Sequence, residues 1–293
     1  MSRPVIITVA PTGGMLRSDA HPHVPTQPDQ IAADVARCVD AGASAAALHV
    51  RRLDETATCD PALYREVNRL VRERCDVVIN NSSGGGVSGE MRTDLGGGMA
   101  EFSWPQRLAA TDGGADTVTL DAITAWATVD GDEVLMNTPA SRARELAQRI
   151  RRAGAVPEWE VFNPSHITKD IPELIAATGA GGPHIVNICL DLDRVFSNAS
   201  PWTPRQLELM VDQLPAQAVF SVSVGGSDPF PALAHALILG GHIRVGLEDH
   251  PWHPDGSPAT NLELVQRAVR LVKALGMRPA TPDETRRLWG LVA

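Results

Sequence analysis

Short apolar runs rich in β-branched residues alternate with longer segments of helical periodicity along the whole chain. Each short run ends at Gly, Pro, Asn or Asp, a pattern that is typical of buried strands. The predicted strands are residues 5–10, 45–50, 77–81, 117–120, 158–162, 184–189, 219–222 and 242–245.

The longer segments between these runs carry helix start signals. Prolines near the first helical position, as in Thr26-Gln-Pro-Asp and Thr203-Pro204, and the terminal Thr281-Pro-Asp-Glu are typical of helix N-termini. The predicted helices end near residues 38, 74, 152, 178, 214, 239 and 275, and a short one follows residue 281. Residues 87–104 are expected to be a long loop, followed by a poorly defined helix at 105–110.

Eight strands alternating with about eight helices predict one (β/α)8 barrel over residues 1–293, with a C-terminal helical tail. A doubly wound open sheet is the alternative. Glu158 and Glu160 favour the barrel because the period of two puts both on one face of a strand. Two carboxylates would be costly beneath helices, but they are expected inside the mouth of a barrel.

Residues 240–250 have the composition of an active-site loop at the end of a buried strand. The apolar run breaks at Gly246 and is followed by Glu248 and Asp249. Arg244 is near enough in sequence to form an ion pair with Asp249, and the carboxylate of Glu248 could hold a divalent metal. A surface turn with an ion pair is the alternative interpretation.

In a barrel, the C-terminal ends of all strands meet at one mouth, and many polar residues fall there in this sequence. Arg244, Glu248, Asp249, Glu158 and Glu160 are candidate catalytic or metal-binding residues, and Thr12, Ser82, Ser83 and Thr119 are candidate substrate-binding residues. His49 is a candidate metal ligand beside Glu248, although a core histidine bonded to the backbone is the alternative. The serines could equally be turn residues.

The composition and net charge of the chain limit the kinds of partner that it can bind. The net charge of -9 over 293 residues argues against nucleic acid and against a basic membrane-surface helix. No apolar run approaches the length of a membrane span. The four cysteines have no paired spacing, so reduced thiols and a cytoplasmic location are expected. Small-molecule ligands are therefore the expected partners.

Several motifs together resemble the β-keto acid cleavage enzymes. They are IITVAPTGG at 6–14, PTQPDQIA at 25–32, AGAS at 41–44, LHVR at 48–51, SSGGG at 82–86, PEWEVF at 157–162 and GGHIRVGLED at 240–249. Their order and spacing extend the resemblance over nearly the whole chain, and the last motif is the most specific.

The resemblance implies a (β/α)8 barrel, a homo-oligomer (dimer or tetramer) and a divalent metal, usually zinc, held here by His49 and Glu248. It implies that a β-keto acid reacts with acetyl-CoA through a metal-stabilised enolate to give acetoacetate and a new acyl-CoA. Arg244 and Asp249 would manage deprotonation, Ser82 would anchor the carboxylate, and Glu160 or Glu158 would position or relay a proton.

Two departures from the family pattern change this expectation. Ala47 stands where the family has the first histidine of a His-x-His metal motif, and Gly13, Gly14 and Met15 stand where the founding enzyme has a glutamate for its substrate's ammonium group. We therefore expect a neutral or anionic substrate without an amine. Because of Ala47, a CoA-independent metal-dependent carbon-carbon lyase and a catalytically silent ligand-binding paralogue remain alternatives.

Overall fold

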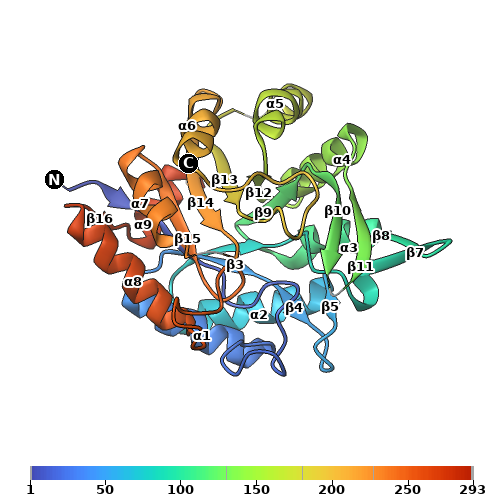
Figure 1. Cartoon of the computed structure of the whole chain (residues 1–293), viewed down its shortest axis with the longest axis horizontal. Helices are drawn as coiled ribbons and strands as arrows, with labels where there is room; N and C mark the ends of the chain where they lie inside the picture. The colour runs from blue at the N-terminus through green and yellow to red at the C-terminus, as the bar shows by residue number, and fades with distance from the viewer. Residues whose placement is uncertain (1, 130, 180, 227, 292–293) are drawn as a thin grey trace.

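The computed structural model describes residues 2–129, 131–179, 181–226 and 228–291, and within these residues eight parallel strands close into a barrel (Figure 1). Neighbouring strands are consecutive along the chain, and the last pairs with the first through Arg244 and Thr8. The predicted (β/α)8 barrel is thus confirmed. Its strands are β2 (Ile7–Val9), β3 (Ala45–Leu48), β6 (Val78–Asn81), β9 (Thr117–Asp121), β12 (Val156–Val161), β13 (His184–Leu190), β14 (Ala218–Val224) and β15 (His242–Val245).

Helices surround the barrel (Figure 1). They are α1 (Pro28–Ala41), α2 (Pro61–Arg74), α3 (Trp104–Ala109), α4 (Ala140–Arg152), α5 (Ile171–Thr178), α6 (Pro204–Asp212), α7 (Phe230–Ile238), α8 (Asn261–Ala274) and α9 (Pro282–Leu288). The expected start signals are in place. Thr203 accepts a hydrogen bond from Gln206 N at the start of α6, and Thr281 forms a capping box with Glu284 at the start of α9.

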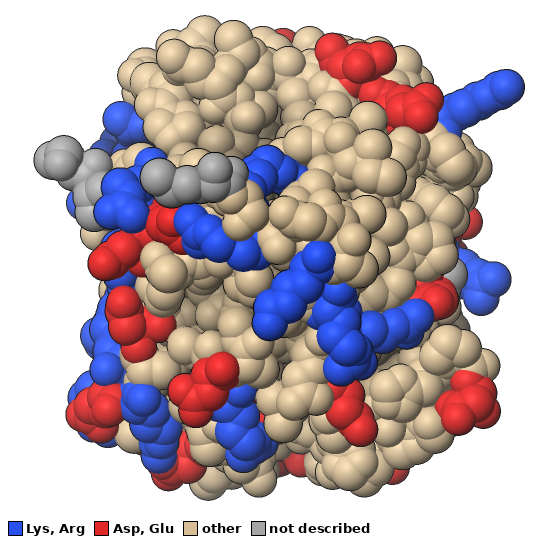
Figure 2. Space-filling view, turned by 90° about the vertical axis from the view of Figure 1, so that its left-hand side faces the viewer, with Lys and Arg blue, Asp and Glu red and all other residues tan. Residues whose placement is uncertain are grey.

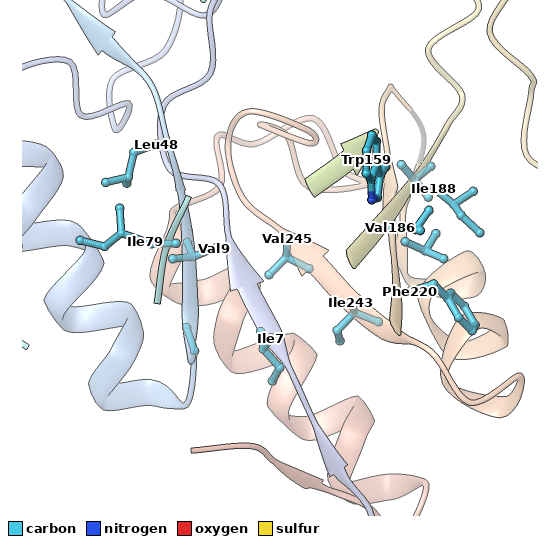
Figure 3. Close-up of a cluster of buried hydrophobic side chains, with 14 of the residues drawn as sticks. Ile7, Val9, Leu48, Ile79, Trp159, Val186, Ile188, Phe220, Ile243 and Val245 are labelled. Atoms are coloured by element: carbon cyan, nitrogen blue, oxygen red, sulfur yellow. The ribbon is translucent and has the colours of Figure 1, made fainter. Parts of the chain in front are cut away.

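Alternate residues of each strand divide between two environments. Ile7, Val9 and Leu48 belong to the large apolar core of strand and helix side chains, shown in part in Figure 3. A separate cluster joins Ile6 and Ala45, from the intervening strand positions, to Trp289 beside α9. The C-terminal tail thereby packs on the N-terminal end of the barrel, and the polar side chains gather at the other end.

The prediction of an irregular segment at 87–104 was wrong. This segment contains a 3₁₀ turn (Gly89–Met91) and two antiparallel strands, β7 (Arg92–Gly96) and β8 (Met99–Phe102). The segment around Trp126, where no strand was predicted, forms β10 (Thr124–Val129) and β11 (Asp132–Asn137), and β11 pairs with β8. The result is a four-stranded sheet outside the barrel, ordered β10-β11-β8-β7. These strands are partly exposed and contain polar residues, so they lack the apolar run that marks a barrel strand.

Smaller pairings complete the fold. β1 (Pro4–Val5) pairs with β16 (Arg278–Pro279), and β4 (Val50–Arg51) pairs with β5 (Ala57–Thr58). The predicted helix at 167–178 begins instead as a π-helical turn (His166–Asp170) before α5.

The surface carries both signs of charge. Figure 2 shows the face that carries α8, where acidic and basic side chains are interspersed over the lower part. No helix among the described residues has the length and apolar character needed to cross a membrane.

We expect Gly246→Ala to destabilise the fold and disturb the loop that follows β15. Gly246 has a φ of +155°, and an added Cβ would lie 2.1 Å from the carbonyl oxygen of Ala10. Backbone strain of this kind costs about 1–3 kcal/mol, and displacing Ala10 adds to it. Urea unfolding measures the change.

The matched control is Gly240→Ala, at the other end of the same strand. Gly240 also has a positive φ, but an added Cβ would meet nothing within 4 Å. The unfolding free energy of Gly240→Ala should fall by only about 1 kcal/mol. Equal losses for the two variants would contradict the proposed contact with Ala10.

Candidate active site

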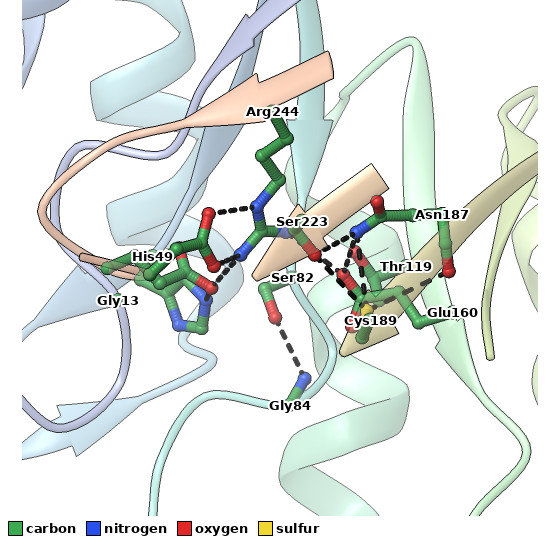
Figure 4. Close-up of polar contacts among 12 residues, drawn as sticks. Gly13, His49, Ser82, Gly84, Thr119, Glu160, Asn187, Cys189, Ser223 and Arg244 are labelled. Carbon is green, nitrogen blue, oxygen red and sulfur yellow. Dashed lines mark hydrogen bonds and ion pairs between the residues drawn. The ribbon is translucent and has the colours of Figure 1, made fainter. Parts of the chain in front are cut away.

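The side chain of Arg244 lies at the centre of the barrel mouth and contacts three carboxylates (Figure 4). Its Nε and Nη2 atoms donate to Asp249 Oδ2 and Oδ1, both at 2.9 Å. Nη2 also lies 2.5 Å from Glu248 Oε1, and Nη1 lies 3.0 Å from Glu160 Oε1. The two-pronged contact fixes Asp249 in position and orientation. Arg244, Glu248, Asp249 and Glu160 are therefore brought together as the sequence predicted.

Asp249 and Glu248 share one guanidinium, but their pKa values differ. Burial raises the pKa of Asp249 to about 6, with Glu248 adding to the effect and Arg244 opposing it. Burial also acts to raise the pKa of Glu248, but the charges of Arg244 and His49 outweigh it and hold that pKa at about 2. Asp249 is thus poised to exchange a proton near neutral pH, whereas Glu248 stays ionised.

A second group of acids lies on β9 and β12. The Asp121 carboxyl is buried, and burial together with the charge of Glu160 raises its pKa well above the ordinary value. Glu158 also faces the barrel interior and is buried, and it accepts a hydrogen bond of 2.6 Å from Asn80 Nδ2. Glu160 lines the cleft, whereas Glu158 is not among its lining residues.

Ser82 lies at the mouth with its hydroxyl oxygen already oriented. Gly84 N donates to Ser82 Oγ at 3.0 Å, which leaves the serine hydroxyl proton free to donate to a ligand (Figure 4). Both Ser82 and Gly84 line the cleft. This arrangement suits an anionic oxygen, as a substrate carboxylate would supply.

The other three candidate substrate-binding residues make structural contacts. Ser83 Oγ donates to the carbonyl of Thr119 at 2.8 Å, and Thr119 Oγ1 donates to Asn80 Oδ1 at 2.9 Å. Thr12 lines the cleft, but its hydroxyl donates to the carbonyl of Pro25 at 2.8 Å. Their roles in binding stay predictions.

A cleft opens above these groups, and residues of the barrel strand ends and of the outer sheet line it. Its floor is polar, with His49, Ser82, Glu160 and Arg244, and part of its wall is apolar, with Phe102 and Phe162 among the residues. Gly14 also lines it, and an added Cβ there would lie 2.7 Å from the Gly85 carbonyl oxygen. The backbone therefore leaves no room for a side chain at that position.

Sequence reasoning assigned no role to Arg107, although it touches the site from behind. This arginine of α3 is completely buried, and its guanidinium donates to the carbonyls of Ser83 and Asp121 and to the hydroxyl of Thr138. Its Nη2 lies 3.7 Å from Asp121 Oδ2. A single arginine in a short helix gave no signal. Asp121 was recognisable only as the inward residue two positions after Thr119.

His49 and Glu248 come together as expected, with His49 Nε2 3.3 Å from Glu248 Oε1. Glu248 Oε2 and His49 Nδ1 are buried without a hydrogen-bond partner, so the donors fit a divalent metal in kind. They do not fit a resident zinc in number, because catalytic zinc sites use three protein ligands. No group of three suitable side chains occurs among the residues that the structure describes, and Ala47 occupies the position next to His49 on the inner face.

A parallel barrel with clustered acids and an arginine at its C-terminal mouth defines an enzyme of the TIM-barrel class. The β-keto acid cleavage enzyme family model matches residues 4–291, and the chain belongs to this family. It is 33% identical over 290 residues to the 3-keto-5-aminohexanoate cleavage enzyme of Acetoanaerobium sticklandii, covering 98% of both chains.

Relatives with other substrates are also similar. The chain is 33% identical to the 3-dehydrocarnitine:acetyl-CoA trimethylamine transferase of Rhizobium meliloti, covering 98% of this chain and 96% of the relative. The solved binary complex of ObcA with oxaloacetate shares the fold, with a TM-score of 0.68 and 20% identity over 92% of this chain and 67% of that one.

We expect Ala47→His to bind zinc at least about tenfold more tightly than the wild type, because a third donor completes the set. Equilibrium dialysis against zinc buffers measures the affinity. The gain should vanish in the double variant Ala47→His, His49→Ala. Wild-type protein that binds zinc as tightly as Ala47→His would contradict the two-donor assignment.

A second prediction concerns pH. Burial raises the pKa of Glu158 to about 8, and Glu160 adds to this. The folded protein therefore holds this proton more tightly than the unfolded chain does. Glu158 contributes stability that is complete below pH 4.5, the ordinary pKa, and that is lost as pH rises to about 8.

Glu158→Gln removes this titration because an amide stays neutral. Between about pH 5 and about pH 9, the urea midpoint of the wild type should fall more than that of Glu158→Gln. Glu133→Gln, an exposed change on β11, should follow the wild type. Parallel curves for the wild type and Glu158→Gln would contradict the raised pKa.

Proposed function

We propose that this protein catalyses acyl-CoA-dependent cleavage of a β-keto acid. In this reaction a β-keto acid and acetyl-CoA give acetoacetate and a new acyl-CoA. The observation that carries the proposal is Asp249, held by two hydrogen bonds from Arg244 beside Ser82 in a chain of this family. Relatives named 3-oxoadipate:acetyl-CoA acetyltransferase and 3,5-dioxohexanoate:acetyl-CoA acetone transferase support acetyl-CoA as the co-substrate.

The proposed steps use this chain's own residues. The hydroxyl of Ser82 and the guanidinium of Arg244 hold the substrate carboxylate and orient the methylene between its two carbonyls. Asp249 removes a proton from that methylene, because its pKa near 6 keeps it ionised yet basic at neutral pH. The carbon then attacks the acetyl carbonyl of the thioester, and Glu160 positions Arg244 for these steps.

His49 and Glu248 are the proposed ligands of a divalent metal, with zinc the expected ion. When bound, such an ion would polarise the ketone as a Lewis acid. Because the chain supplies only two donors, retention of the ion would depend on oxygen atoms of the substrate. The four cysteines are free thiols, three of them buried, which supports a cytoplasmic location, and the family resemblance favours a homo-oligomer.

Incubation with acetyl-CoA and a panel of β-keto acids should give acetoacetate, with an amine-free acid preferred over 3-keto-5-aminohexanoate. Asp249→Asn should lower kcat about 100-fold or more, because the amide cannot accept the proton. The control Asp255→Asn changes an exposed carboxylate far from the cleft lining and should leave kcat unaltered.

Three other outcomes are distinguishable. Turnover without acetyl-CoA would select a carbon-carbon lyase. Binding of the keto acid or CoA without turnover by any panel member would select a silent ligand-binding protein, the alternative that Ala47 favours. A preference for 3-keto-5-aminohexanoate would contradict the expected specificity for an amine-free acid.

A further inference from the structure

We propose that the side chain of the β-keto acid is an uncharged hydrocarbon group, bound in an apolar chamber beside the catalytic groups. This inference rests on the proposed function and names its substrate class. The chamber is the part of the cleft wall formed by Phe102, Ala127, Met136, Phe162, Leu192 and Phe196.

The sheet outside the barrel supplies half of these walls. Phe102 comes from β8, Ala127 from β10 and Met136 from β11, and all three are almost completely buried. They belong to a compact apolar cluster that is distinct from the main core and that includes Phe162. Half of the chamber is therefore built by strands that lie outside the barrel.

The remaining wall is fixed against β10. The segment after β13 runs beside this strand, with Thr128 N donating to the Val195 carbonyl at 2.8 Å and Ser197 N donating to the Trp126 carbonyl at 3.0 Å. The rings of Phe162 and Phe196 pack edge to face with centroids 5.4 Å apart. Because these contacts hold the wall in place, the apolar surface is formed before a ligand binds.

The chamber offers no counter-ion for a charged side chain. The six side chains that form the chamber are all apolar, and the carboxylates of Glu160, Glu248 and Asp249 make their contacts with Arg244 on the polar floor of the cleft. An ammonium or a second carboxylate would therefore be buried against hydrocarbon without a partner, which is costly. An alkyl chain would gain free energy from the same surface.

The chamber could instead receive the pantetheine arm of CoA. That arm contains amides, and buried amides need hydrogen-bond partners. The side chains of the chamber supply none, whereas the terminal alkyl group of a keto acid needs none. The geometry therefore favours the keto acid side chain.

The chemistry of such a substrate balances. A new bond joins C2 of the keto acid to the acetyl carbon, the C2–C3 bond breaks, and CoA sulfur passes from the acetyl group to the departing acyl group. The proton removed from C2 returns there in acetoacetate. The hydrocarbon side chain leaves in the new acyl-CoA.

The test compares 3-oxopentanoate, 3-oxohexanoate and 3-oxooctanoate with 3-oxoadipate and 3-keto-5-aminohexanoate, each with acetyl-CoA. We expect kcat/KM to rise roughly threefold per added methylene between the first two acids, and to exceed that of either charged acid by about 100-fold. A flat series, or a preference for a charged acid, would overturn the inference. It would leave the proposed function intact, which fails only if no acid yields acetoacetate.

Ala127→Leu adds bulk to the wall of the chamber and tests whether the selectivity for the side chain arises there. It should lower kcat/KM for 3-oxooctanoate at least about tenfold more than for 3-oxopentanoate, through KM of the keto acid. Ala125→Leu adds the same bulk to the same face of β10 and the same apolar cluster, but position 125 does not line the cleft, so selectivity should stay unchanged. A rise in KM for acetyl-CoA alone would assign the chamber to pantetheine and overturn the proposal.

Calorimetric binding gives a readout that does not need turnover. The stable analogue 3-hydroxyhexanoate should bind at least about tenfold more tightly than 3-hydroxyadipate, and Ala127→Leu should weaken 3-hydroxyoctanoate more than 3-hydroxypentanoate. Equal affinities would overturn the inference even for a protein without activity.

Discussion

The site depends on one electrostatic constraint: a single buried guanidinium must serve three carboxylates. Arg244 cannot fully neutralise Asp249, Glu248 and Glu160 at once, and burial makes the excess negative charge costly. One acid must therefore hold its proton more tightly than usual. That acid is Asp249, whereas Glu248 has the added charge of His49 beside it. The same balance that organises the mouth also makes one of its acids a base of near-neutral pKa.

The surroundings of this cluster continue the pattern. Arg107 approaches Asp121 from outside the barrel, while Asn80 satisfies Glu158 within it. The surroundings of Glu158, Glu248 and Asp249 therefore differ, and so do their pKa values. Such a spread is how one fold provides both ionised and protonated carboxyl groups at one pH. His49 and Glu248, the proposed metal ligands, belong to the same network because Glu248 also contacts Arg244.

In the proposed reaction, the chemistry and the choice of substrate depend on different parts of the fold. The polar floor is built by strand ends that every barrel of this kind has, and the family likeness follows those strands. Half of the side chains of the chamber come from β8, β10 and β11, which lie outside the barrel. Segments of this kind can vary without loss of the barrel, because its core does not depend on them.

The sequence by itself determined the barrel, the inward face of Glu158 and Glu160, and the pairing of Arg244 with Asp249, because strand periodicity and short-range spacing fix these features locally. The proximity of His49 and Glu248 was also predicted, but that prediction depended on the family resemblance and on the expected barrel. Only the tertiary structure decided the contacts of Arg107 and the strands at 92–102 and 124–137. A buried arginine looks like any surface arginine in the sequence, and the strands that pair outside the barrel mix polar with apolar residues. Their positions follow from packing between segments far apart along the chain, which no local pattern records.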